Sequence, residues 1–153
     1  MPPPTGPLVR PATAPDRDAW LGMRDALWPG ERDEHAAEID RFLRGERTNP
    51  LETLLAFSSD DAAIGFVELS LREFAEGCAS SPVCYVEGWF VAAEHRRSGV
   101  GAALIRAAAD WGRARGAREM ASDVELDNEI SLTAHRALGF DEVARAVLLR
   151  RDL

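Results

Sequence analysis

The apolar residues of the chain recur at two spacings, one typical of helices and the other typical of strands. Trp20, Met23 and Leu27 lie three or four positions apart, as on the buried face of a helix. Ile64 and Phe66 lie two positions apart, as on the buried face of a strand. Over the whole chain these patterns predict strands at 8–10, 54–58, 63–72, 83–91, 119–123, 140–144 and 147–150, and helices at 13–28, 33–44, 99–115 and 127–138.

This order of elements predicts an α/β protein with a mixed sheet. Residues 1–7 are rich in proline and are expected to form a disordered or extended tail. The remaining residues, 8–153, suit one domain, since a single hydrophobic core is usually built from about 100 to 200 residues. Gly88 interrupts the strongest strand pattern, 83–91, and predicts a bulge or a splayed backbone there.

The charge of the chain disfavours some partners and favours others. Asp and Glu outnumber Lys and Arg by 26 to 18, which gives a formal net charge of −8. Such a field repels nucleic acid and anionic membrane surfaces and attracts cationic substrates. No apolar run approaches the roughly 18 residues that cross a bilayer, and the N-terminus lacks a secretory pattern, so a cytoplasmic protein is expected. Cys78 and Cys84 indicate neither a disulfide framework nor a metal site.

A basic, glycine-containing turn, EHRRSGVG, joins the strand at 83–91 to the helix at 99–115. Gly99 and Gly101 would let the backbone approach a ligand closely, and the helix N-terminus presents unpaired N–H groups to it. Two arginines add positive charge, so the turn predicts a pyrophosphate site. A Rossmann dinucleotide site would need a third glycine where Leu104 stands, whereas a purely structural turn with surface arginines stays an alternative.

The turn also resembles that of a known family. An R-x-x-G-x-G sequence between a strand and a helix is similar to the acyl-CoA loop of the GNAT N-acetyltransferase superfamily, and Asp127-Asn128 and 135–140 resemble its closing helix and Leu-Gly-Phe ending. The resemblance implies the GNAT acyl-CoA N-acyltransferase fold, a central twisted, mostly antiparallel sheet flanked by about four helices. It also implies acetyl-CoA as co-substrate without a metal, held by Phe90, Val91, Arg96, Arg97, Ser98, Gly99, Val100, Gly101, Asn128 and His135.

Further stretches resemble the bacterial aminoglycoside 6'-N-acetyltransferases in particular, over nearly the full length after the tail. They are, in order, Leu27-Trp28, 65–72, Ser81-Pro82, 85–91, 96–101 and 121–123. The resemblance implies direct transfer of an acetyl group from acetyl-CoA to the 6'-amine of an aminoglycoside, which would confer resistance, and a homodimer. Two alternatives stay open. One is a GNAT enzyme for another amine, such as a polyamine, an amino acid or a protein N-terminus, and the other is a non-catalytic acyl-CoA-binding regulatory module.

The resemblance assigns roles to carboxylates, because a protonated amine must be held and deprotonated before it attacks. Asp123 is the expected proton acceptor, Glu87 the expected ligand of substrate ammonium groups, and Glu68 a further substrate contact. Trp28 would border the sugar and stack on it. Three of them have a structural alternative: an ion pair with an arginine for Glu87, a turn or cap for Asp123, and core packing for Trp28.

Two further parts of the reaction have weaker signatures. The superfamily stabilises the oxyanion with backbone N–H groups on the strand that here contains 88–91, so no side chain would mark that role. Many superfamily members carry a tyrosine where this chain has His135, which could protonate the departing thiolate, hydrogen-bond CoA, or lie exposed on its helix. The CoA thiol has an ordinary thiol pKa of about 8.5, so a general acid that protonates the departing thiolate would raise the rate only modestly. His35 and His95 are expected at the surface.

Overall fold

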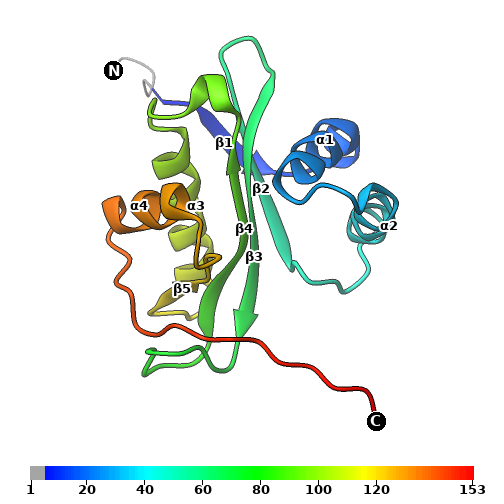
Figure 1. Ribbon diagram of the computed structural model, residues 1–153. Coiled ribbons are helices and arrows are strands. Elements are labelled where there is room, and N and C mark those ends of the chain that lie inside the picture. The colour runs from blue at the N-terminus through cyan, green and yellow to red at the C-terminus, as the bar shows by residue number, and fades with distance from the viewer. Residues whose placement is uncertain (1–5) are drawn as a thin grey trace.

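In the computed structural model, which describes residues 6–153, these patterns form a sheet with helices on both faces (Figure 1). The strands are β1 (Leu8–Pro11), β2 (Glu52–Phe57), β3 (Ala63–Arg72), β4 (Val83–Val91) and β5 (Met120–Ser122). The helices are α1 (Arg17–Leu27), α2 (Arg32–Leu43), α3 (Val100–Ala114) and α4 (Glu129–Ala137), with short 3-10 helices η1 (Ala14–Asp16) and η2 (Ala93–His95). The predicted mixed fold class with four flanking helices is confirmed over these residues.

The sheet has the order β1-β2-β3-β4-β5, and its neighbours are antiparallel except for the parallel pair β4 and β5. A bulge interrupts the long ladder between β3 and β4. Glu68 pairs with Gly88 and Leu69 pairs with Val86, so Glu87 is the extra residue. A bulge bends its strand and redirects the side chains next to it. The irregularity predicted at Gly88 is therefore confirmed, and it lies beside a carboxylate.

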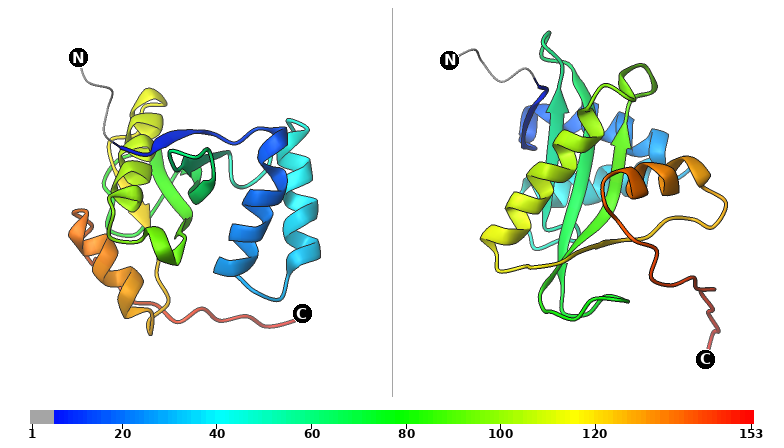
Figure 2. Two further views of the ribbon diagram at one scale, coloured as in Figure 1. Left: turned by 90° about the horizontal axis from the view of Figure 1, so that it is seen from above. Right: turned by 90° about the vertical axis from the view of Figure 1, so that its left-hand side faces the viewer.

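Neighbouring side chains of β3 supply the two cores that hold the helices against the sheet. Phe66 packs with Trp20 and Ile39 beneath α1 and α2, whereas Val67 packs with Leu104 beneath α3. Successive residues of a strand point to opposite faces, so a strand covered on both sides needs apolar residues at both parities. Figures 1 and 2 show the result, with α3 on one face of the sheet and the α1–α2 pair on the other.

Strands β4 and β5 part soon after they begin to pair. Their parallel ladder covers only Cys84, Tyr85 and Val86 on β4. β4 then continues to Val91 with β3 as its strand partner, while the chain after β5 leads away to α4 (Figure 2). We call the place where the strands part, between Glu87 on β4 and Asp123 after β5, the β4–β5 fork. Beyond it, the β5-facing edge of β4 has no strand partner within residues 6–153.

The two predicted C-terminal strands, 140–144 and 147–150, are wrong for this structure, because residues 140–153 form neither strand nor helix. Val143 packs against Gly77 in the loop between β3 and β4, and the chain then runs outward in an extended path (Figure 1). Apolar alternation produces a strand only where a neighbouring strand pairs with it, and the edge strand β5 is three residues long. We call residues 141–153 the C-terminal tail.

Two further sequence expectations concern the N-terminus and the membrane. Of the proline-rich tail, residues 1–5 lie outside the described residues, and Gly6 and Pro7 belong to neither helix nor strand. None of the helices in the described part of the chain is both long and apolar enough to cross a membrane.

Candidate active site

The turn before α3 has the backbone shape of an anion-binding loop. Gly99 has a φ of +86° and caps α3, and Arg97 has a φ of +60°, so both residues are left-handed. Arg96 donates from Nε to the carbonyl of Val91 at 3.0 Å, which ties the turn to the end of β4. Arg96, Arg97 and Ser98 are exposed at the α3 N-terminus, where unpaired N–H groups and the helix dipole attract an anion. The structure thus gathers the basic part of the predicted loop.

The residues behind this loop pack their side chains inward. Val100 is buried in the core, and a Cβ at Gly101 would lie 2.9 Å from Cζ2 of Trp89. Gly101 therefore lets α3 approach β4 closely. Phe90 stacks on Phe66 with ring centroids 5.9 Å apart, on the α1–α2 side of the sheet. These positions offer a ligand their backbone rather than their side chains.

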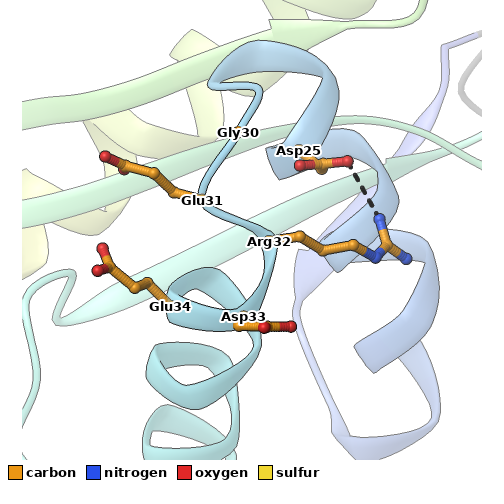
Figure 3. Close-up of a pocket in the computed structure, with 6 residues that line it drawn as sticks. All are labelled: Asp25, Gly30, Glu31, Arg32, Asp33 and Glu34. Carbon is orange, nitrogen blue, oxygen red and sulfur yellow. Dashed lines mark hydrogen bonds and ion pairs between the residues drawn. The ribbon is translucent and has the colours of Figure 1, made fainter.

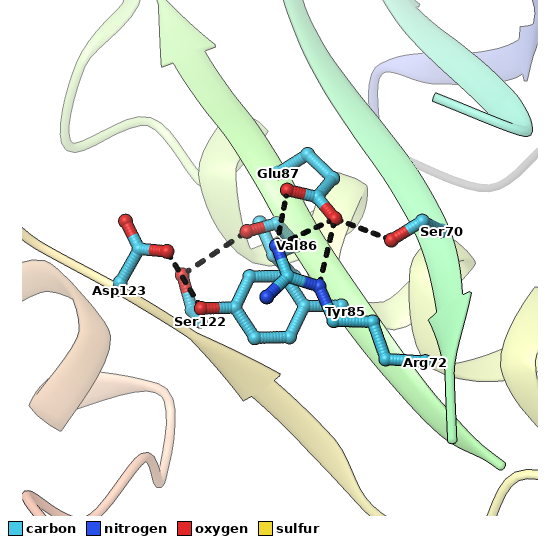
Figure 4. A network of polar contacts seen from close by, with 7 residues as sticks. All are labelled: Ser70, Arg72, Tyr85, Val86, Glu87, Ser122 and Asp123. Atoms are coloured by element: carbon cyan, nitrogen blue, oxygen red, sulfur yellow. Dashed lines mark hydrogen bonds and ion pairs between the residues drawn. The ribbon is translucent and has the colours of Figure 1, made fainter. Parts of the chain in front are cut away.

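Glu87 and Asp123 lie on opposite sides of the β4–β5 fork and are joined by a polar network (Figure 4). Arg72 holds Glu87, with Nη2 2.8 Å from Oε2 and Nε 3.1 Å from Oε1. Its guanidinium carbon also lies 3.4 Å from the ring centroid of Tyr85. Tyr85 in turn donates its hydroxyl to Oδ2 of Asp123 at 2.6 Å, and Ser70 donates to Glu87. The arginine pair that was the structural alternative for Glu87 is therefore present.

This network keeps the Tyr85 phenol protonated. Burial, helped by the hydrogen bond to Asp123, raises the pKa of Tyr85 above its ordinary value, so the phenol stays a donor at neutral pH. Tyr85 engages only Oδ2 of the exposed Asp123. Within residues 6–153, Oδ1 of Asp123 has no hydrogen-bond partner. Asp123 thus presents one committed oxygen and one open oxygen.

The two site residues predicted on α4 both make structural hydrogen bonds. Asn128 caps α4 by accepting the backbone N–H of Ser131 at 3.0 Å. His135 is 6% exposed, so the solvent-exposed alternative for it is wrong. Its Nδ1 lies 2.7 Å from the carbonyl of Ser131 and its Nε2 2.9 Å from Oγ of Ser122. Because a carbonyl only accepts, Nδ1 carries the proton and Nε2 accepts from Ser122.

Glu68 lies in the core beneath α1 and not at the fork. It is 1% exposed, accepts Nε1–H of Trp20 at 3.0 Å and pairs with Arg24 at 3.1 Å. Burial raises the pKa of Glu68 to about 7, although the charge of Arg24 acts in the opposite direction. A direct substrate contact through Glu68 would therefore need this side chain to leave its partners. His35, expected at the surface, is 4% exposed, and that expectation is wrong.

Trp28 follows α1 as its C-terminal cap and is half-buried. Its indole lies against the bulge in β4, because a Cβ at Gly88 would meet Cη2 of Trp28 at 2.4 Å. His35 explains part of this placement, since its Nε2 lies 2.9 Å from the carbonyl of Trp28. The structure thus brings Trp28 next to Glu87, as a residue bordering the substrate would require.

A hollow of about 530 Å³ lies at the turn between α1 and α2 (Figure 3). It is lined by Asp25, Gly30, Glu31, Arg32, Asp33 and Glu34, and it contains none of the predicted site residues. Arg32 pairs with Asp25 at 3.3 Å, while Glu31 and Glu34 point away from that pair. We call Asp25, Glu31, Asp33 and Glu34 the acidic rim. The rim flanks Trp28 in the sequence, since Asp25 lies three residues before it and Glu31 three residues after it.

Sequence reasoning missed Arg72 and Tyr85 as parts of the site. One signal was available for Arg72, because Glu68, Ser70 and Arg72 fall on one parity of a strand and form a polar stripe. The stripe alone does not show which carboxylate of a neighbouring strand lies beside Arg72. Register decides that, since Ser70 lies opposite Tyr85 and the bulge directs Glu87 to the same place.

These features, a divided sheet with an anion-binding turn entering α3, are those of the acyl-CoA transferases named above. The model of the Acetyltransferase (GNAT) family matches residues 19–140, and the chain belongs to this family. It is an acetyl-CoA-dependent N-acetyltransferase, and the sequence prediction of fold, enzyme class and co-substrate is confirmed.

Within this family, the chain is most informatively compared with relatives named for one activity. The chain is 47% identical over 150 residues to "Aminoglycoside N(6')-acetyltransferase type 1" of Klebsiella aerogenes, covering 97% of this chain and 99% of the relative. It is 42% identical over 136 residues to the protein of the same name from Salmonella typhimurium, covering 88% and 91%. Among solved structures, AAC(6')-Iy in complex with the bisubstrate analogue CoA-S-monomethyl-acetylneamine is 38% identical with a TM-score of 0.88, covering 97% of this chain and 100% of that one. The resemblance to aminoglycoside 6'-N-acetyltransferases is confirmed.

Proposed function

We propose that the protein transfers the acetyl group of acetyl-CoA to the 6'-amine of aminoglycosides and thereby confers resistance, as the names of its relatives suggest. The observation that carries the proposal is the β4–β5 fork. There, two carboxylates lie next to an unpaired stretch of β4 backbone: Glu87 is paired with Arg72, and Asp123 accepts from Tyr85, whose ring Arg72 covers. A fork of this kind can hold an extended thioester arm and a cationic amine side by side.

The turn before α3 suits the diphosphate of acetyl-CoA, which supplies the acetyl thioester. Arg96, Arg97 and Ser98 are exposed around a left-handed backbone at Arg97 and Gly99. A backbone of this kind turns successive N–H groups toward an anion, and the dipole of the 15-residue helix α3 adds to the attraction. Phe90 and Val91 would pair by backbone with the pantetheine arm along the free edge of β4. Asn128 and His135 stay proposed contacts on the α4 side.

The substrate amines would meet a carboxylate that is already partly neutralised. Glu87 is held by Arg72 at 2.8 Å, so a substrate ammonium group must share it with the guanidinium. The acidic rim adds negative charge near Trp28, which supports a substrate with several positive charges. The half-buried indole of Trp28 offers a face for a sugar ring. Glu68, buried behind α1, would act on the substrate only indirectly.

Asp123 is the proposed proton acceptor. The ammonium proton passes to Oδ1, directly or through water, while Tyr85 keeps Oδ2 occupied. The freed nitrogen lone pair forms the C–N bond to the acetyl carbon, the nitrogen releases its second proton to water as it becomes the amide, the C–S bond breaks, and the thiolate takes up one proton. Backbone N–H groups between Gly88 and Val91 would stabilise the oxygen that becomes negative during this step.

His135 is the proposed source of the thiolate proton, acting through Ser122. Because Nε2 accepts from Ser122 in the resting site, this role requires the imidazole to take up a second proton at Nε2, which then passes to Oγ of Ser122 as the serine hydroxyl gives its own proton to the thiolate. The imidazole is buried, and the Ser122 hydroxyl, 2.9 Å from Nε2, is its polar contact on β5, the strand that ends at the fork. The thiolate is a good leaving group, so this relay would contribute only modestly to the rate. A hydrogen bond to CoA is the other proposed role for His135.

The protein is proposed to act as a cytoplasmic homodimer. In the C-terminal tail, Val147, Leu148 and Leu149 are 77%, 94% and 89% exposed, and a run of exposed apolar residues marks an interface. A second copy would cover them. Cys78 and Cys84 are free thiols, the state that a reducing compartment maintains. Light scattering should show a dimer for the whole chain and a monomer for a chain ending at Asp141, and a monomeric whole chain would refute the dimer.

Release of free thiol from acetyl-CoA tests the reaction. Purified protein is mixed with kanamycin or tobramycin, and a kanamycin derivative blocked at the 6'-amine is the matched control. Turnover with the first two and none with the third is expected. If no aminoglycoside releases CoA, the aminoglycoside assignment fails while family membership stands. A rise in the kanamycin concentration that inhibits growth of an expressing strain, absent for Asp123→Asn, tests the resistance role.

A further inference from the structure

Arg24 is a buried cation that the proposed reaction does not use. It lies on α1 at 7% exposed and bridges two carboxylates, Glu38 of α2 at 2.6 Å and Glu68 of β3 at 3.1 Å. Glu68 also accepts the indole N–H of Trp20. Buried ion pairs often give no more stability than apolar side chains of the same size would. The stability of the α1–α2–β3 contact alone therefore does not explain why charged groups occupy this site.

The free side of Arg24 faces Trp28. The guanidinium carbon lies 5.6 Å from the indole centroid, within the range of a cation–π contact. The backbone of Trp28 is fixed as well, since its N–H donates to the carbonyl of Arg24 at 2.9 Å and its carbonyl lies 2.9 Å from Nε2 of His35. The indole is thus anchored at its backbone and bordered by Arg24.

The opposite end of the indole touches the bulge in β4. A single methyl group at Gly88 would overlap Cη2 of Trp28, so no spare space separates the two. Gly88 follows Glu87, the proposed ligand of the substrate ammonium group. Any displacement of the indole therefore changes the surface directly beside the amine-binding carboxylate.

We propose that Arg24, held by Glu38 and Glu68, is a positioning residue that fixes the Trp28 indole against Gly88 and so sets recognition of the aminoglycoside but not of acetyl-CoA. This inference rests on the proposed function for its substrate and deepens it. The acetyl-CoA turn before α3 is connected to β4 through Val91 and does not contact Arg24, which is why the two substrates respond differently.

The test removes both buried charges together, so that neither is left unpaired. In Arg24→Met/Glu68→Gln the methionine fills the space of the aliphatic stem, and the glutamine oxygen can still accept from Trp20. The matched control is Arg17→Met/Asp40→Asn, which removes an ion pair at 2.6 Å that also links α1 to α2 but lies on the exposed side, away from Trp28.

A first measurement needs no substrate. The chain has four tryptophans, so protein labelled with 5-fluorotryptophan should give four fluorine resonances, and Trp28→Phe assigns one of them. In Arg24→Met/Glu68→Gln the Trp28 resonance should shift or broaden, while that of Trp111, on α3 at the opposite face of the sheet, stays in place. The control variant should leave Trp28 unchanged. An unmoved Trp28 resonance overturns the positioning role whatever the enzyme acetylates.

A second measurement separates recognition from turnover. The double variant should raise KM for the aminoglycoside by about tenfold, with KM for acetyl-CoA unchanged and kcat little affected. The same two substitutions placed in Trp28→Ala should give no further rise, because their effect passes through the indole. An equal rise in the Trp28→Ala background, a parallel rise of both KM values, or no rise at all would each overturn the inference. Absence of turnover in the wild-type protein refutes the proposed substrate instead.

Discussion

Substituting Glu68 by glutamine probes what burial has done to this carboxyl. Its ordinary pKa is 4.5, and burial raises it to about 7 in the folded protein, against the opposing effects of Arg24 and Trp20. A carboxyl whose pKa is raised by folding binds its proton more tightly in the native state. Its stabilising contribution is therefore complete below the unfolded pKa and is lost as the pH rises through the folded pKa.

The size of the effect follows from the two pKa values. At about 1.4 kcal/mol per pKa unit, the change from 4.5 to about 7 corresponds to about 3 kcal/mol, nearly all of it between about pH 4.5 and pH 8. Glutamine keeps an oxygen for the N–H of Trp20 and does not titrate. The free energy of unfolding of the wild type minus that of Glu68→Gln should therefore fall by about 3 kcal/mol across this range. That is a large share of a total that is typically about 5–15 kcal/mol.

Urea unfolding of both proteins at a series of pH values measures this difference. With an ordinary urea dependence of about 2 kcal/mol per molar, the midpoint of the wild type should move relative to the variant by more than about 1 M. Asp40→Asn is a matched control, because the hydrogen bond from Arg17 lowers the pKa of Asp40 and confines its effect to more acidic solutions. A wild-type-minus-Glu68→Gln difference that stays constant with pH, or grows as the pH rises, would show that Glu68 is not held as the structure indicates.

Three substitutions address the reaction itself. Asp123→Asn should lower kcat at least about 100-fold while calorimetry finds acetyl-CoA binding intact, and near-normal turnover would remove Asp123 from the mechanism. Gly99→Asp places a side chain at φ +86° and a negative charge at the loop, so acetyl-CoA affinity should fall at least about tenfold, and unchanged affinity would contradict the loop assignment. Gly88→Ala puts a methyl group 2.4 Å from Trp28, so KM for the aminoglycoside should rise about tenfold in steady-state assays. Equal KM values for Gly88→Ala and the wild type would mean that the indole does not line the substrate site.

The sequence correctly predicted those helices and strands that the local spacing of apolar residues is enough to specify. The boundaries of β3 and β4 agree with the prediction, and the bulge at Gly88 was anticipated because glycine breaks a strand pattern at that point. The C-terminal strands were not formed, because pairing depends on a partner that local spacing does not encode. His35 was misplaced for a similar reason, since its hydrogen bond to the Trp28 carbonyl exists only after α1 and α2 pack together.

The sequence predicted the carboxylates of the candidate site but not the contacts that connect them. Glu87 and Asp123 were singled out because the family resemblance places their strands around the active-site cleft and chemistry at an ammonium group calls for carboxylates. Their link through Arg72 and Tyr85 depends on the registers of β3 with β4 and of β4 with β5, which no single segment specifies. The acidic rim at the α1–α2 turn was likewise hidden, because acidic residues at a helix N-terminus are also ordinary capping residues.

The contact between Gly88 and Trp28 also constrains how this enzyme can acquire new preferences. The two residues are far apart in sequence, yet any side chain larger than hydrogen at position 88 collides with the indole. A mutational path to altered selectivity through position 88 must therefore first shrink or remove the aromatic ring at position 28. In a library that randomises both positions, the surviving active clones should show the two residues changing together, with bulk exchanged from one to the other.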